Sequence, residues 1–216
     1  RINKYSLDFG TATNLGLKRV NDMFTEQGRS GVPGGILYIT DGKSDNSTLT
    51  NTEAKWIRDA EIRTIAVGVG SVFTGTAELA ELQDIATEPG LALVLNDFNE
   101  FENMDFFVKK ICSAPSSATD QCNIPMDIAL IVDTSDSIKA QDFRKVKQFV
   151  QDLVLSFKIG LAETRIAVIP FASYVNDVQV IELRSSLVSG YLSGLIEAKL
   201  YQDLLNVGTN TSEGIS

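Results

Sequence analysis

The sequence predicts a doubly wound α/β fold with a mostly parallel sheet, one antiparallel edge strand and helices on both faces. Short apolar runs rich in β-branched residues alternate with longer segments of helical periodicity. This alternation, which favours parallel winding, restarts after a polar stretch at residues 113–125. With 216 residues, 44% hydrophobic and 22% charged, the chain can bury a substantial core.

The part of the chain before residue 113 contains four predicted helices and three predicted strands. The helices are expected at residues 13–27, 52–61, 76–87 and 99–112, and the strands at 35–40, 63–70 and 91–95. Residues 43–52 are polar and are expected to form a loop. Phe106, Phe107 and Ile111 are expected on the core side of the last helix, and Trp56 in the core.

Residues 113–125 have the composition of a linker, because Ser, Ala, Thr, Pro and Asp dominate without periodicity. Cys112 and Cys122 flank this stretch. Two cysteines are too few to build a disulfide scaffold, and a structural bridge and free thiols both remain open.

The part after the linker repeats the alternation. Strands are expected at residues 128–132, 165–171 and 178–183, and helices at 142–156 and 186–199. Only residues 172–177 join the last two strands, so these are expected to form a hairpin whose second strand is antiparallel.

Charge and composition exclude several classes of function. The formal net charge of −9 argues against nucleic acid and an anionic membrane surface as partners. The absence of histidine excludes serine–histidine and cysteine–histidine catalysis and the usual zinc enzymes. No apolar stretch reaches 18 residues. The first residue is not Met, so we expect a fragment or an excised mature piece.

A cluster of oxygen donors directly follows the apolar strand at residues 128–132. Asp133, Ser135 and Ser137 place a carboxylate and two hydroxyls at alternate positions of one loop. Ligands collect at the carboxyl ends of strands in an open parallel sheet. Oxygen ligands suit a hard divalent cation, with Mg²⁺ preferred. The alternative without a metal is a polar turn that caps the following helix.

The two ends of the chain repeat one pattern. Residues 7–17 align without gaps to residues 205–215, and Leu, Gly, Thr, Thr and Gly coincide. The chain is therefore expected to start and stop at equivalent points of one repeated unit.

These motifs resemble the von Willebrand factor A domain, or I domain, and its metal-ion-dependent adhesion site. The family's Asp-x-Ser-x-Ser loop, its Gly-x-Thr-x-Thr segment and its Thr-Asp-Gly element all have counterparts here. The resemblance implies a Rossmann-like fold. The metal ligands that it implies are Asp133, Ser135, Ser137, Thr209, Asp41 and Thr11.

The order of these motifs departs from the order within one family domain. Residues 1–112 match the C-terminal half of a first domain, 113–125 the linker, and 126–216 the N-terminal half of a second. Two alternatives remain open. The chain is a piece of a tandem array cut out of register, or its two halves complement each other as one permuted domain.

The resemblance also implies a function. It implies a secreted, non-enzymatic module of the extracellular matrix that binds a protein such as collagen through Mg²⁺, with Mn²⁺ or Ca²⁺ possible. A carboxylate of the partner would complete the coordination. Tandem copies imply self-association and multivalent bridging. In a secreted protein, Asn46 would be a glycosylation candidate because Asn46-Ser47-Thr48 is a sequon.

A second class of function is a Mg²⁺-dependent phosphoryl-transfer enzyme of a haloacid-dehalogenase-like type. Asp133 would then be the nucleophile. That pattern requires a second Asp two residues later, where this chain has Ser135. Gly68-Val-Gly70 lacks the later glycine of a dinucleotide loop and favours tight packing instead.

Overall fold

The computed structural model describes residues 10–112 and 124–202 of the chain. The strands are β1 (Gly34–Thr40), β2 (Arg63–Val69), β3 (Ala92–Leu95), β4 (Asp127–Asp133) and β5 (Arg165–Phe171). The α-helices are α1 (Thr13–Gln27), α2 (Ser47–Asp59), α3 (Thr76–Ile85), α4 (Met104–Cys112), α5 (Ala140–Leu155) and α6 (Ser189–Lys199). Short 3₁₀ helices span Ser71–Thr74, Pro89–Leu91, Phe98–Glu102 and Leu183–Ser185.

The five strands form one sheet in the order β3-β2-β1-β4-β5, and every neighbouring pair is parallel. Strands from both sides of the predicted linker meet at its centre. Gly34 of β1 lies opposite Asp127 of β4, and Ile39 lies opposite Val132. The predicted doubly wound α/β class is confirmed.

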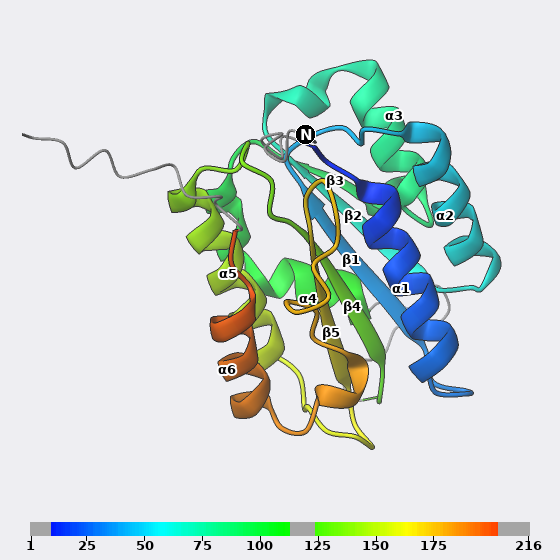
Figure 1. Ribbon diagram of the computed structural model, residues 1–216, viewed down its shortest axis with the longest axis vertical. Coiled ribbons are helices and arrows are strands. Elements are labelled where there is room, and N and C mark those ends of the chain that lie inside the picture. The colour runs from blue at the N-terminus through cyan, green and yellow to red at the C-terminus, as the bar shows by residue number, and fades with distance from the viewer. Residues whose placement is uncertain (1–9, 113–123, 203–216) are drawn as a thin grey trace, which may run out of the picture.

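Helices cover both faces of the sheet. Figure 1 shows α1, α2 and α3 on one side, and α4, α5 and α6 on the other. Helix α5 turns a continuous apolar stripe to the sheet, as its periodicity predicts. The buried residues of α5 are Phe143, Val146, Phe149, Val150, Leu153 and Val154. One core cluster contains residues of all five strands and of both helical layers.

The prediction of an antiparallel strand at residues 178–183 is wrong. Its backbone pairing is an isolated antiparallel bridge between Ile181 and Val168. Asn176 accepts hydrogen bonds at its side-chain oxygen from Val178 N and at its carbonyl from Gln179 N, which folds the chain into a turn there. Val178 is therefore 73% exposed rather than part of the sheet.

Two predicted helix starts are wrong for reasons of local capping. Helix α2 begins at Ser47, inside the predicted loop, because the Asn46 side chain accepts a hydrogen bond from Leu49 N. The predicted helix at 99–112 is divided into two pieces. Asp97 caps a 3₁₀ helix at Phe98–Glu102, and α4 starts only at Met104.

Two aromatic residues predicted in the core lie at the surface. Phe106 is 37% exposed, whereas Phe107 and Ile111 of the same helix are buried as predicted. Trp56 is 45% exposed. Aromatic character alone therefore did not identify the core.

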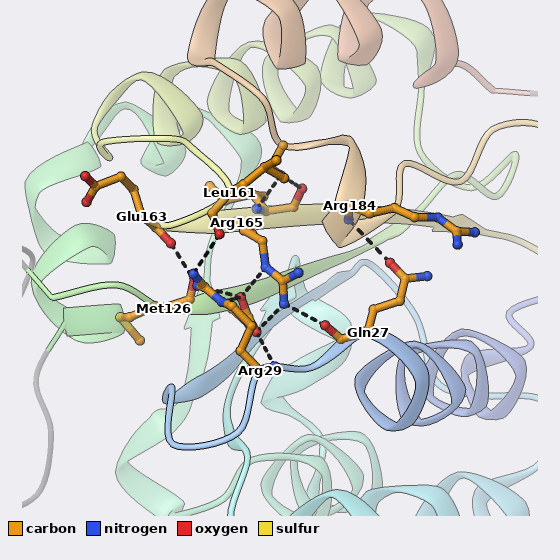
Figure 2. Close-up of polar contacts among 10 residues, drawn as sticks. Gln27, Arg29, Met126, Leu161, Glu163, Arg165 and Arg184 are labelled. Carbon is orange, nitrogen blue, oxygen red and sulfur yellow. Dashed lines mark hydrogen bonds and ion pairs between the residues drawn. The ribbon is translucent and has the colours of Figure 1, made fainter.

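An ion-pair network closes the edge of the sheet where the strands begin (Figure 2). Asp127, 1% exposed, accepts two hydrogen bonds from Arg165, at 2.8 Å from Nε and 2.6 Å from Nη2. It also accepts hydrogen bonds from Arg29 N at 2.9 Å and Arg29 Nε at 3.0 Å. Because Arg29 precedes the linker and Asp127 follows it, the network ties the two parts of the chain together.

Cys112 is buried at the end of α4. Cys122 lies outside the described residues, so the predicted Cys112–Cys122 bridge stays a prediction. None of the helices that the structure describes combines the length and apolar composition that crossing a membrane requires.

Candidate metal centre

The carboxyl ends of β1 and β4 lie side by side and bring two aspartates together. Asp41 directly follows the last residue of β1, and Asp133 is the last residue of β4. The Thr40 hydroxyl donates a hydrogen bond of 2.7 Å to Asp133 Oδ2, across the two strands. Parallel pairing therefore assembles the site from segments on either side of the linker.

Asp133 is a buried carboxylate. Its side chain is 0% exposed, and its Oδ1 accepts a hydrogen bond of 2.9 Å from Ser135 N. Burial, with a smaller contribution from the negative charge of Asp41, raises the pKa of Asp133 to about 6. Among the described residues, no lysine or arginine forms an ion pair with either aspartate. The negative charge of Asp133 is therefore buried without a compensating cation from these residues.

A chain of hydroxyls leads from Asp133 to Asp41. The Ser135 and Ser137 hydroxyl oxygens lie 2.8 Å apart, and Ser137 donates a hydrogen bond of 2.7 Å to Asp41 Oδ1. Partial burial raises the pKa of Asp41 above its ordinary value, although the Ser137 hydrogen bond opposes this. Ser135 is buried and Ser137 is exposed, so the site opens to solvent at Ser137.

Thr11 lies against the turn that carries Asp41. A Cβ atom placed on Gly42 would be 3.8 Å from the Thr11 hydroxyl oxygen. The Thr11 carbonyl accepts a hydrogen bond of 3.0 Å from Asp45 N, and the next residue, Ala12, donates one of 2.7 Å to the Ala172 carbonyl. The predicted ligand Thr11 is thus held beside Asp41, whereas Thr209 lies outside the described residues.

Three residues that support the site were missed by sequence reasoning. Thr40 bridges to Asp133, as described above. Glu81 of α3 is 7% exposed and accepts hydrogen bonds from Ser44 N and the Ser44 hydroxyl at 2.8 Å each, and from the Ser47 hydroxyl. Gln202 Nε2 donates to the carbonyls of Ser135, at 3.1 Å, and Ile138, at 2.8 Å.

Only Thr40 had a local signal, its place in the Thr-Asp-Gly element. Glu81 reads as an ordinary helix glutamate, and Gln202 stands in no motif. Their partners are more than 30 residues away, and no spacing rule reaches that far.

The donor set fits a hard divalent cation. It consists of two carboxylates and several hydroxyls, all oxygen. In the part of the chain that the structure describes, no group of three or more His, Cys, Asp or Glu side chains is placed to hold a metal. Softer metals that prefer thiolate or imidazole find no ligands here. A hard cation would compensate the buried charge of Asp133.

Two other sequence expectations concern single residues. Asn46 is exposed, and its side-chain oxygen caps α2. At Gly68, a Cβ atom would lie 2.7 Å from the ring of Phe73, which is 2% exposed. The close approach of Phe73 agrees with the expected tight packing at Gly68.

Comparison with known proteins identifies a domain type. The family model for the von Willebrand factor type A domain matches residues 2–107 and 127–212. The collagen alpha-6(VI) chain of Mus musculus is 31% identical over 175 residues, which are 79% of this chain and 7% of that protein. Matrilin-3 of Homo sapiens is 43% identical over 51 residues, 24% of this chain and 10% of that protein. The chain thus spans a small part of these relatives.

Solved structures of proximal thread matrix protein 1 from the mussel byssus are also similar. One is 28% identical, covers 88% of this chain and 49% of the mussel chain, and has a TM-score of 0.42. Another structure of the mussel protein is described with a zinc-occupied MIDAS motif. It is 28% identical, covers 87% of this chain and 47% of the mussel chain, and has a TM-score of 0.41.

Proposed function

Because this chain belongs to the von Willebrand factor type A domain family, we propose that it is a non-enzymatic adhesion module that binds an extracellular matrix protein through a divalent cation. The observation that supports this most is the hydrogen bond from Ser137 to Asp41. It joins the two carboxylate-bearing loops into one oxygen-lined site that is open at its outer side.

The two parts of the chain, 1–112 and 126–216, complement each other as one domain with a permuted order. The parallel pairing of β1 with β4 supports this, because it places the closing aspartate of one part beside the opening loop of the other. The partly buried Arg29–Asp127 contact supports it at the opposite edge. Thr11 then serves as the threonine ligand.

Each residue has a separate role in holding the cation. Asp133 supplies a buried negative charge, fixed by Thr40 and by the backbone of Ser135. Ser135, Ser137 and Thr11 supply neutral oxygens, and Asp41 supplies the second charge at the exposed side. Mg²⁺ fits best, and Mn²⁺ or Ca²⁺ can replace it. The bound cation would accept a carboxylate of the partner as its last ligand, because two aspartates nearly neutralise it without filling its coordination.

The partner is a secreted matrix protein, with collagen the first to test, and the module itself is secreted into the extracellular matrix. The relatives named above, a collagen VI chain and matrilin-3, support this setting. Asn46, exposed at the start of α2, is then a glycosylation site. Further copies of the module in one protein would strengthen weak contacts through effective concentration and would favour self-association.

Collagen binding to the 216-residue chain, measured in Mg²⁺, in Mn²⁺ and in EDTA, tests this function. We expect binding in either metal, its loss in EDTA, and its loss in Ser135→Ala. The matched control is Asp136→Asn, because Asp136 lies in the same loop but is exposed. Binding that survives both chelation and Ser135→Ala would refute the metal mechanism.

A further inference from the structure

A basic pocket lies at the edge of the sheet opposite the candidate metal centre. It encloses roughly 350 Å³. Its lining residues are Arg63, Glu88, Gly90, Leu91, Phe106, Lys109 and Lys110. Arg63 is the first residue of β2, whereas Asp41 and Asp133 stand where β1 and β4 end. Since these strands are parallel, the pocket and the metal centre are at opposite ends of the strands.

Two donor groups of Arg63 have no acceptor among the residues that the structure describes. Its Nε and Nη1 atoms are buried and have no hydrogen-bond partner. Burial lowers the pKa of Arg63, and Glu88 opposes this through its charge without forming an ion pair within 4.0 Å. Two buried guanidinium nitrogens without an acceptor are costly, so an acceptor from outside the chain would be favourable here.

The other lining residues define what kind of acceptor fits. Lys109 and Lys110 add two positive charges against the one negative charge of Glu88, in a chain whose formal net charge is −9. Phe106 contributes a ring that is 37% exposed, with Lys110 Nζ 5.7 Å from its centroid. Positive charge beside an exposed aromatic face suits an anionic group attached to a ring-shaped ligand.

We propose that this pocket binds a sulfate group, carried by a sulfated polysaccharide of the matrix. The Arg63 guanidinium donates to one oxygen of the sulfate, and the Lys110 ammonium reaches another. Phe106 packs against the sugar ring. Free inorganic sulfate shares the chemistry of the anion but lacks the ring, so the two sources can be separated. The site is independent of the cation and of the proposed adhesion function.

Thermal unfolding in EDTA tests the anion site itself. Sodium sulfate replaces sodium chloride at constant ionic strength, and the resulting shift in Tm is measured. The shift is compared among variants, because sulfate also stabilises proteins in general. We expect a larger shift for the wild type than for Arg63→Gln. Lys18→Gln, which removes one exposed charge from α1, is expected to shift as the wild type does. Equal shifts in all three chains would overturn the site.

Titration calorimetry with a heparin-derived hexasaccharide, also in EDTA, tests whether the bound sulfate group is carried by a polysaccharide. We expect one bound hexasaccharide per chain, weakened about tenfold or more in Arg63→Gln by loss of a charge-assisted contact. Lys110→Gln, a substitution at a partly exposed side chain, is expected to weaken binding too and covers the case that Arg63→Gln misfolds. Undiminished binding in Lys110→Gln and in any folded Arg63→Gln would overturn the proposal. A Tm shift in inorganic sulfate without any binding of the hexasaccharide would also overturn the proposal, because the polysaccharide would then not be the ligand.

Discussion

The Ser137 hydroxyl donates a hydrogen bond of 2.7 Å to Asp41 Oδ1, although 96 residues separate the two in the chain. The contact joins a loop that follows β4 to a turn that follows β1. It exists because these two strands are neighbours in the sheet. The candidate metal centre therefore depends on tertiary pairing between the two parts of the chain, and each prediction below tests one element of that arrangement.

Asp133→Asn is expected to abolish the stabilisation of the chain by Mg²⁺ while making the metal-free chain more stable by about 1 kcal/mol. Asparagine keeps the acceptor for Ser135 N and removes the buried charge that burial penalises. Urea unfolding in EDTA and in Mg²⁺ measures both effects. A variant that is less stable than the wild type in EDTA would contradict the description of Asp133 as an uncompensated charge.

Glu81→Ala is expected to destabilise the chain by about 2 kcal/mol and to weaken Mg²⁺ binding several-fold. The substitution leaves three donors, two of Ser44 in the loop after Asp41 and one of Ser47 at the start of α2, without their acceptor. Chemical unfolding and calorimetry report the two quantities. Asp84→Ala, an exposed position on the same helix, is the control and is expected to change neither. Unaltered Mg²⁺ affinity in Glu81→Ala would show that this carboxylate does not position Asp41.

Asp127→Asn is expected to destabilise the chain by about 3–5 kcal/mol at pH 7, because it breaks a buried ion-pair network. Asp177→Asn breaks a pair whose carboxylate is 78% exposed and is expected to cost less than about 1 kcal/mol. Urea unfolding of both variants measures the contrast. Similar costs would show that burial does not strengthen the Asp127 network.

The same network sets a pH dependence. Burial alone would raise the pKa of Asp127, but hydrogen bonds from Arg165 and Arg29 outweigh it and hold this pKa below its ordinary value of 3.8. The stabilisation is therefore complete above that value and is lost as pH falls through the lowered pKa. In acid titrations of stability, the wild type is expected to lose its advantage over Asp127→Asn below about pH 4. A difference that stays constant down to pH 2 would contradict this linkage.

Gly68→Ala is expected to cost about 1–3 kcal/mol, since its Cβ would meet the buried ring of Phe73. Gly194→Ala on α6 has open space at that position and is expected to stabilise slightly, because alanine favours the helix. Thermal unfolding of both variants checks the opposite signs. A neutral Gly68→Ala would show that Phe73 can move aside.

The sequence predicted the strands well because each is an apolar run with sharp polar ends. β5 matches its prediction at both ends, and β4 is one residue longer at each end. The errors arose where one side chain changes the local backbone. Asn46 starts α2 early, and Asn176 turns the chain away from the sheet. Such capping contacts depend on geometry that periodicity does not contain.

For the candidate site, the sequence predicted candidate residues but not which segments of the chain meet. Local motifs proposed Asp133, Ser135, Ser137, Asp41 and Thr11 as candidate ligands. The motifs alone did not decide which segments meet, because the repeat offered both Thr11 and Thr209 for one role. Pairing of β1 with β4 brings Asp41 to Ser137 and sets Thr11 beside the same turn. Glu81 was missed since its role depends on distant loop atoms.

Titration calorimetry of the 216-residue chain with Mn²⁺ tests the central claim most directly. We expect one ion per chain, with binding lost in Asp133→Asn and equally in Asp41→Asn, because the two aspartates come from different parts of the chain and serve one site. Asp136→Asn is expected to bind as the wild type does. Binding that is retained in Asp41→Asn, or a stoichiometry of two ions, would contradict a single shared metal centre.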